Sequence, residues 1–232
     1  MAKSFSERES EVAELMKQAD TGDADAQYKF ARYLLFEDDE DLRKDLSPDE
    51  VKRAMDYLQL AAIQGYRFGW AAAILGDLYY AGELIPQDFE KARLWYNTAL
   101  LKENPGASYK LGEYSYYGID CPVDHEEAVK YYMQSLDGCY IDAFVRLGAM
   151  FMRGEYFSQD IEFAKILFEF VRDYEKDRID WFGVKSALYE MALSAIVELE
   201  QGVVKQSGAD KAVGVQKAVR ERLLEVMDEV KV

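Results

Sequence analysis

Residues 71–99 read AAAILGDLYYAGELIPQDFEKARLWYNTA, and the same pattern returns twice at intervals of 36 residues. The recurring positions are a leading alanine, a Leu-Gly pair, a loop glycine, an aspartate, a second alanine and an aromatic residue. They are Ala71, Leu75, Gly76, Gly82, Asp88, Ala92 and Tyr96, then Ala107, Leu111, Gly112, Gly118, Asp124, Ala128 and Tyr132, then Ala143, Leu147, Gly148, Gly154, Asp160, Ala164 and Phe168. A period of this length, made of two amphipathic patterns, is typical of stacked helix pairs. The sequence therefore predicts an all-α repeat protein.

Each copy carries the signals of two helices and of the connection between them. From Ala71 to Tyr79, small and apolar residues recur three to four positions apart, which predicts one buried helix face. Gly82 follows where a C-terminal cap is expected, and Asp88 places an acid at the start of a second helix. Gly76 lies inside the first helix at a cost of roughly 1 kcal/mol relative to alanine. We therefore expect close backbone contact between the paired helices at this position.

More degenerate copies flank the three clear ones. An earlier repeat begins at Ala26 and has an enlarged acidic connection, residues 37–41, which we expect to be a solvated loop before a capping box at residues 47–50 (SPDE). The predicted organisation is an N-terminal capping helix in residues 1–25, a repeat array in residues 26–172 with repeats at about 26–70, 71–106, 107–142 and 143–180, and a degenerate C-terminal repeat with a capping helix in residues 181–232. Alternatively, the helix expected at about residues 210–230 docks on a partner.

Composition and charge exclude several classes of function. The net charge of −16 and the pI near 4.6 disfavour a polyanion, so we exclude nucleic acid as the main partner. No apolar run approaches the roughly eighteen residues of a membrane span, and the first residues lack the pattern of a secretory leader. Hydrophobic residues make up 50% of the chain, enough to build a core. We expect a cytoplasmic protein with no membrane partner.

Catalytic and metal-binding patterns are sparse. The single histidine, His125, has no second histidine with which to form a metal site. Cys121 lies four residues before it, but the sequence shows neither an orienting group nor an oxyanion loop. Cys139 lacks the spacing of a zinc motif, and no Gly-rich phosphate loop is present. The sequence predicts a protein that is not an enzyme, with no catalytic residues, no metal site and no cofactor, in which both cysteines are structural or incidental.

The recurring positions resemble the Sel-one-like repeat, a relative of the tetratricopeptide repeat. The shared pattern joins an Ala-x-x-x-Leu-Gly-x-x-Tyr helix to an Asp-x-x-Lys-Ala-x-x-Trp-Tyr helix through a glycine-containing loop, and residues 13–172 follow it well. The resemblance implies a right-handed α-solenoid of stacked antiparallel helix pairs, with about four to five repeats plus capping helices, that acts as an adaptor or scaffold. At the family's second loop glycine this chain has Leu84, Asp120 and Tyr156, so we expect those loops to be shaped differently.

The resemblance also implies a binding surface, because the first helix of each pair lines a concave groove in tetratricopeptide arrays. The residues that correspond to groove-facing and flanking positions are Tyr28, Lys29, Arg32, Asp77, Tyr80, Tyr109, Lys110, Glu113, Tyr116, Arg146 and Met152. Tyrosine offers such a groove a large apolar face with a polar tip. We expect the basic residues to pair with carboxylates of an extended peptide or acidic terminus. The alternative is that they keep the helix face soluble and reach a neighbouring acid such as Glu113.

The sequence thus favours a protein–protein interaction scaffold or adaptor that holds a partner protein or an extended peptide in its concave groove. Two other classes stay open at this point. A small-molecule-binding or hydrolytic module of the repeat family would show one deep pocket with convergent polar groups. A regulatory or structural subunit of a larger complex would show a flat apolar patch on an outer face. The oligomeric state is left open.

Overall fold

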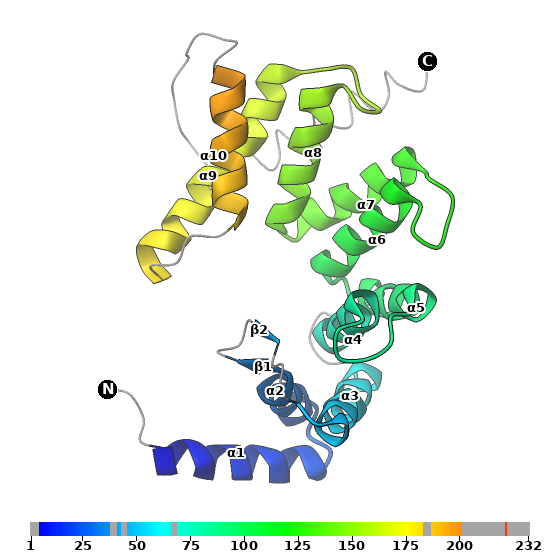
Figure 1. Ribbon diagram of the computed structural model, residues 1–232, viewed down its shortest axis with the longest axis vertical. Coiled ribbons are helices and arrows are strands. Elements are labelled where there is room, and N and C mark those ends of the chain that lie inside the picture. The colour runs from blue at the N-terminus through cyan, green and yellow to red at the C-terminus, as the bar shows by residue number, and fades with distance from the viewer. Residues whose placement is uncertain are drawn as a thin grey trace. The chain divides into compact units, whose positions relative to one another are not determined.

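A computed structural model of the chain describes residues 5–37, 41–42, 46–65, 69–182, 187–200 and 221. Within these residues it contains ten α-helices and one short two-stranded ribbon. Figure 1 shows the order of these elements along the chain. The helices form two compact bodies, which we call the N-terminal body (Met1–Leu111) and the C-terminal body (Gly112–Val232). The all-α prediction is confirmed for the part of the chain that is described.

The N-terminal body is a succession of helices in which each element packs on the next. Its elements are α1 (Phe5–Asp20), α2 (Ala24–Leu35), β1 (Phe36–Glu37), β2 (Asp41–Leu42), α3 (Pro48–Ile63), α4 (Trp70–Ala81) and α5 (Phe89–Leu100). Contacts run from α1 to α2, from α2 to α3, from α3 to α4 and from α4 to α5. This nearest-neighbour order is the one expected of repeats that bury their apolar faces against each other.

The C-terminal body continues the same order. Its elements are the end of α6 (Pro105–Tyr117), which contains the boundary between the bodies, then α7 (His125–Asp137), α8 (Ile141–Arg153), α9 (Ile161–Phe182) and α10 (Ala187–Glu200). Helix α8 contacts both α7 and α9, and α10 contacts α9. The predicted capping helix at about residues 210–230 falls outside the described residues apart from Glu221.

The connection between α2 and α3 differs from the predicted solvated loop. Phe36 pairs with Leu42 and Glu37 with Asp41 in an antiparallel ribbon. The expected loop was wrong at its two ends, because acidic composition does not prevent the backbone groups of two short segments from pairing with each other. Residues 38–40 lie outside the described residues, so the expectation is not tested there. The capping box that follows is present, since Ser47 accepts from the Glu50 N–H and the Glu50 side chain accepts from the Ser47 N–H.

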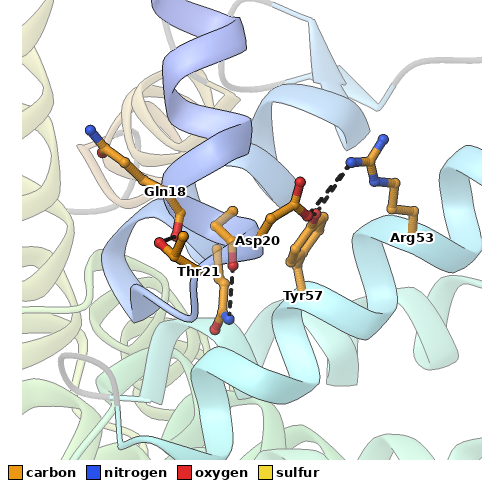
Figure 2. A network of polar contacts seen from close by, with 7 residues as sticks. Gln18, Asp20, Thr21, Arg53 and Tyr57 are labelled. Atoms are coloured by element: carbon orange, nitrogen blue, oxygen red, sulfur yellow. Dashed lines mark hydrogen bonds and ion pairs between the residues drawn. The ribbon is translucent and has the colours of Figure 1, made fainter.

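Helix α1 is anchored to the first repeat by polar contacts at its C-terminal end, drawn in Figure 2. The Tyr57 hydroxyl donates a short hydrogen bond to Asp20, and Arg53 lies 3.8 Å from the same carboxylate. The buried amide of Gln27 donates to the Ala19 carbonyl at 3.3 Å. These contacts join α1 to both α2 and α3.

The helix caps follow the sequence signals. Asp88, Asp124 and Asp160 each accept a hydrogen bond from the backbone N–H three residues later, at 2.9 to 3.0 Å, and so begin α5, α7 and α9. Gly82 and Gly154 have left-handed backbone, with φ values of 71° and 69°, and their N–H groups bond to carbonyls four residues earlier. The repeat therefore specifies both the ends of its first helices and the starts of its second helices.

The glycine inside each first helix makes room for an aromatic ring. A Cβ atom at Gly76 would lie 2.6 Å from the Tyr96 ring, and one at Gly112 would lie 2.5 Å from the Tyr132 ring. The close contact is therefore between the first-helix backbone and a side chain of the second helix, and the expected contact between two backbones was wrong. In the first repeat Ala31 replaces the glycine, and Leu58, which is smaller than tyrosine, stands at the ring position.

In two of the loops between paired helices, a residue other than glycine has left-handed backbone. Asp120 and Tyr156 have φ values of 53° and 64°, so the backbone at these two positions retains the conformation that glycine adopts most readily. Leu84 is not among the residues with positive φ, so the three loops are not alike at this position. Glu103 and Cys139, which lie in the turns after α5 and α7, also have positive φ, at 56° and 57°. Left-handed backbone without glycine costs roughly 1 kcal/mol at each such residue.

Candidate functional site

The predicted binding residues all lie on the first helices of the repeats, as expected. Helix α2 carries Tyr28, Lys29 and Arg32, α4 carries Asp77 and Tyr80, α6 carries Tyr109, Lys110, Glu113 and Tyr116, and α8 carries Arg146 and Met152. None of these side chains is fully buried. On α2, Lys29 pairs with Asp25 of its own helix at 2.5 Å, and the Arg32 guanidinium lies 3.4 Å from the Tyr28 hydroxyl.

Four residues of the N-terminal body form a cluster that joins three helices. The Tyr96 hydroxyl of α5 donates to Oδ1 of Asp77 on α4 at 2.7 Å. The Lys110 ammonium of α6 lies 4.0 Å from the same oxygen and 5.2 Å from the ring centroid of Tyr80. We call Asp77, Tyr80, Tyr96 and Lys110 the N-terminal cluster. Desolvation raises the pKa of the Asp77 carboxyl, against the opposing effects of Lys110 and the Tyr96 hydroxyl, although its side chain is 55% exposed.

The C-terminal body contains the same arrangement with different residues, Glu113, Tyr116, Tyr132 and Arg146, which we call the C-terminal cluster. The Tyr132 hydroxyl donates to Oε1 of Glu113 at 2.6 Å. Arg146 donates through Nε to Oε1 at 2.9 Å and through Nη2 to Oε2 at 2.6 Å, a bidentate pair. Its Cζ lies 5.2 Å from the ring centroid of Tyr116. The two charged side chains are 19% and 14% exposed, so the pair is largely buried.

Both clusters couple consecutive repeats. In each, the tyrosine comes from the second helix of the repeat that supplies the acid, while the cation comes from the first helix of the following repeat. Charge-assisted bonds of this kind are stronger than neutral ones, and a buried bidentate pair fixes the relative position of two helices. For Arg146, the structure therefore shows the alternative that the sequence left open, pairing with Glu113.

Where a repeat lacks the tyrosine of the cluster, it also lacks the acid. In the first repeat the positions of the tyrosine and the acid hold Leu58 and Arg32, and the cation position of the next repeat holds Ile74. In the repeat that begins at Ala143, Ala149 stands at the acid position and Phe168 at the tyrosine position. Sequence reasoning missed Tyr96 and Tyr132, although the acid and the tyrosine vary together, at a spacing of 19 residues in the three clear repeats, and this was a readable signal.

Around Tyr116 the C-terminal cluster extends to further titratable groups. The Tyr116 hydroxyl donates a short hydrogen bond to Glu155, whose other oxygen lies 3.3 Å from Arg153. Burial and the neighbouring Glu155 carboxylate raise the pKa of Tyr116 to about 12. The same hydrogen bond lowers the pKa of Glu155. His125 stacks on Tyr116 with ring centroids 5.0 Å apart.

The residues considered for catalysis make separate contacts. The Cys121 thiol donates to the Tyr114 carbonyl at 3.4 Å, whereas His125 stacks on Tyr116. Among the residues that the structure describes, no group of three or more His, Cys, Asp or Glu side chains could hold a metal ion. Nor does any helix in the described ranges combine the length and apolar character that crossing a membrane requires.

Comparison with known proteins identifies the class to which this architecture belongs. Helix pairs that recur with a fixed period, joined by the same polar cluster in consecutive repeats, define an α-helical repeat protein. The Sel1 repeat family model matches residues 24–66, 71–104, 105–136 and 142–170, which is more than half of the chain. The chain belongs to the Sel1 repeat family, and the resemblance read from the sequence is confirmed.

One similar solved structure supports the same fold, and a second is similar over part of the chain. A protective antigen with an SLR fold, present in uropathogenic Escherichia coli strains, aligns with a TM-score of 0.58 and 20% identity over 92% of this chain. The alignment covers 48% of that protein, so this chain spans about half its length. A Sel1 repeat protein from Oxalobacter formigenes aligns with a TM-score of 0.48 and 29% identity, covering 59% of this chain and 96% of that one. No curated protein matches the chain.

The Sel1 repeat family is associated with one general kind of function. Proteins built from Sel1 repeats generally mediate protein–protein interactions. They are typically non-enzymatic scaffolds. The fold class of this chain is an all-α repeat solenoid.

Proposed function

We propose that this protein is a scaffold or adaptor that binds a partner protein or an extended peptide on the face formed by the first helices of its repeats. The observation that carries the proposal is the partial exposure of four tyrosines on these helices. Tyr28 and Tyr109 stand two residues after the leading alanine of their repeats, and Tyr80 and Tyr116 stand nine residues after it. Regularly placed, partly exposed tyrosines suit peptide binding because they bury a large area and lose little side-chain entropy.

Arg146 is not a suitable position at which to test this proposal. Its guanidinium is engaged by Glu113, so replacing Arg146 with glutamate would place two carboxylates in one largely buried site. Loss of binding in that variant would be confounded with loss of stability. A position outside both clusters is therefore needed, and Tyr109 on α6 is partly exposed and belongs to neither.

A photo-crosslinking residue at Tyr109 tests the proposal directly. We expect Tyr109→p-benzoylphenylalanine to give a light-dependent covalent complex with a protein of the source cell, identified by mass spectrometry. The matched control is the same substitution at Leu94 of α5, an apolar residue that is 62% exposed on a second helix. Cross-linking at Leu94 but not at Tyr109 would place the interaction on an outer face and favour the subunit alternative. Absence of cross-linking at both positions would also contradict the proposal.

A further inference from the structure

The carboxylate of the N-terminal cluster makes fewer polar contacts than the carboxylate of the C-terminal cluster. Tyr96 and Lys110 both contact Oδ1 of Asp77, at 2.7 and 4.0 Å, and neither of these contacts involves Oδ2. In the C-terminal cluster the guanidinium of Arg146 engages both oxygens of Glu113. Asp77 is also 55% exposed, against 14% for Glu113. One oxygen of Asp77 therefore lacks the contact that its counterpart has.

The C-terminal cluster shows how a guanidinium fits this arrangement. Arg146 spans both oxygens of Glu113, and its Cζ lies 5.2 Å from the ring centroids of Tyr116 and Tyr117. A planar fork that pairs with a carboxylate and lies over an aromatic face is a geometry that arginine adopts and lysine cannot reproduce. In the N-terminal cluster Tyr80 stands at the position of Tyr116, with the ammonium of Lys110 above it.

Building on the proposed scaffold function, we propose that the N-terminal cluster recognises an arginine side chain of an extended basic segment in the partner. The guanidinium pairs with the Asp77 carboxylate and lies over Tyr80. The guanidinium can displace the Lys110 ammonium, because a single 4.0 Å contact between partly exposed groups contributes little to stability. The net charge of −16 draws basic segments toward the protein at long range.

The Asp77 carboxyl is partly desolvated although its side chain is 55% exposed, and this agrees with the assignment. Desolvation raises the pKa of this carboxyl, and the effects of Lys110 and Tyr96 oppose the shift. A second cation that also reaches Oδ2 would favour the ionised form further. The carboxylate therefore gains more from an added guanidinium than a fully hydrated surface acid would gain.

The test uses three fluorescein-labelled probe peptides of about nine residues, in which leucine and glycine alternate with three arginines, three lysines or three glutamates. Each is titrated by fluorescence polarisation into the full chain at neutral pH. We expect the arginine probe to bind most tightly, the lysine probe more weakly and the glutamate probe least. Two peptides of equal charge thus separate guanidinium recognition from general attraction.

Four variants locate the binding. We expect Asp77→Asn, which keeps an acceptor for the Tyr96 hydroxyl, to lower the affinity for the arginine probe by about tenfold or more. Lys110→Gln should strengthen binding because it removes the resident cation. The matched controls are Glu103→Gln and Lys102→Gln, which change exposed charges on the turn after α5 and should alter binding by about twofold or less. Unfolding midpoints verify that the variants remain folded.

The remaining outcomes overturn the inference. Equal binding of the arginine probe to Asp77→Asn and Glu103→Gln, or equal binding of the arginine and lysine probes, would indicate non-specific attraction. Tighter binding of the glutamate probe would indicate an acidic partner segment instead of a basic one. Failure of all three probes to bind would also overturn it, while cross-linking from Tyr109 would still report separately on the scaffold function.

Discussion

The N-terminal and C-terminal clusters occupy the same repeat positions, yet they hold their charges to different degrees. Asp77 and Lys110 make one contact of 4.0 Å, whereas Glu113 and Arg146 form a largely buried bidentate pair. The extra methylene of glutamate and the fork of arginine account for the closer pairing. The comparison teaches that one repeat position can hold a largely buried ion pair in one repeat and a half-exposed carboxylate in the preceding one.

The largest expected effect comes from breaking the buried pair. Arg146→Met leaves the Glu113 carboxylate largely buried without its guanidinium, and we expect a loss of about 3 kcal/mol in the free energy of unfolding. The matched change Lys110→Met removes one loose contact and should cost about 1 kcal/mol or less. Urea unfolding followed by circular dichroism measures both changes.

The double variant Glu113→Met, Arg146→Met is the control for that prediction. It removes both charges and replaces them with apolar side chains, so much of the stability lost in Arg146→Met should return. Equal losses in Arg146→Met and Lys110→Met would contradict the difference between the clusters.

A smaller effect is expected when tyrosine and phenylalanine are exchanged between repeats. Tyr132→Phe removes the hydrogen bond to Glu113 and should cost about 1 kcal/mol. Phe168→Tyr brings a hydroxyl to the repeat in which Ala149 stands at the acid position, and an unsatisfied buried hydroxyl should cost about 1–3 kcal/mol. Opposite substitutions should therefore both destabilise the protein in thermal unfolding. A neutral or stabilising Phe168→Tyr would show that the hydroxyl does not require the acid.

Giving the N-terminal cluster the charged residues of the C-terminal cluster also tests the comparison. We expect Asp77→Glu with Lys110→Arg to reproduce the bidentate pair and to raise the free energy of unfolding by about 1 kcal/mol. The same double variant should bind the arginine probe less well, because its own guanidinium then holds the carboxylate. Urea unfolding and fluorescence polarisation on one preparation check the two results. A gain in stability without loss of binding would show that the N-terminal cluster does not bind the arginine probe.

Local rules explain why much of the fold was predictable from the sequence. Gly82 and Gly154 adopt the left-handed backbone expected of them, and Asp88, Asp124 and Asp160 cap the second helices, because these signals act over three to six neighbouring residues. The positions of the candidate site residues on first helices followed from the same periodicity. Whether those residues bind a partner stays a prediction.

Contacts between distant residues explain why the rest could not be predicted. Nothing in the sequence near Gly76 indicates that the Tyr96 ring fills the space left by its missing side chain. Pairing of Arg146 with Glu113 depends on how two successive repeats stack, which the period alone does not specify. The ribbon at Phe36 and Leu42 likewise depends on backbone pairing that composition cannot report.

Extremes of pH should weaken the hydrogen bond that extends the C-terminal cluster. The pKa of Tyr116 is raised from 10.0 to about 12, so between these values the unfolded chain loses its proton first and stability falls as pH rises. The pKa of Glu155 is lowered, so its contribution is lost as pH falls below the usual carboxyl range. Unfolding midpoints across pH check both slopes. Tyr116→Phe should flatten them, and unchanged slopes in that variant would assign the titration to other groups.

The smallest expected effect concerns the turn that follows α5 in the N-terminal body. Glu103 is exposed and has a φ of 56°, and it stands four residues after Ala99, as Gly65 (φ 73°) stands four residues after Ala61. Because glycine adopts this conformation without a Cβ clash, Glu103→Gly should stabilise the protein by about 0.5–1 kcal/mol. The gain is limited because glycine also increases the entropy of the unfolded chain. Glu103→Ala is the matched control, since it removes the charge but keeps the Cβ atom, and equal stabilisation by both variants would attribute the effect to charge.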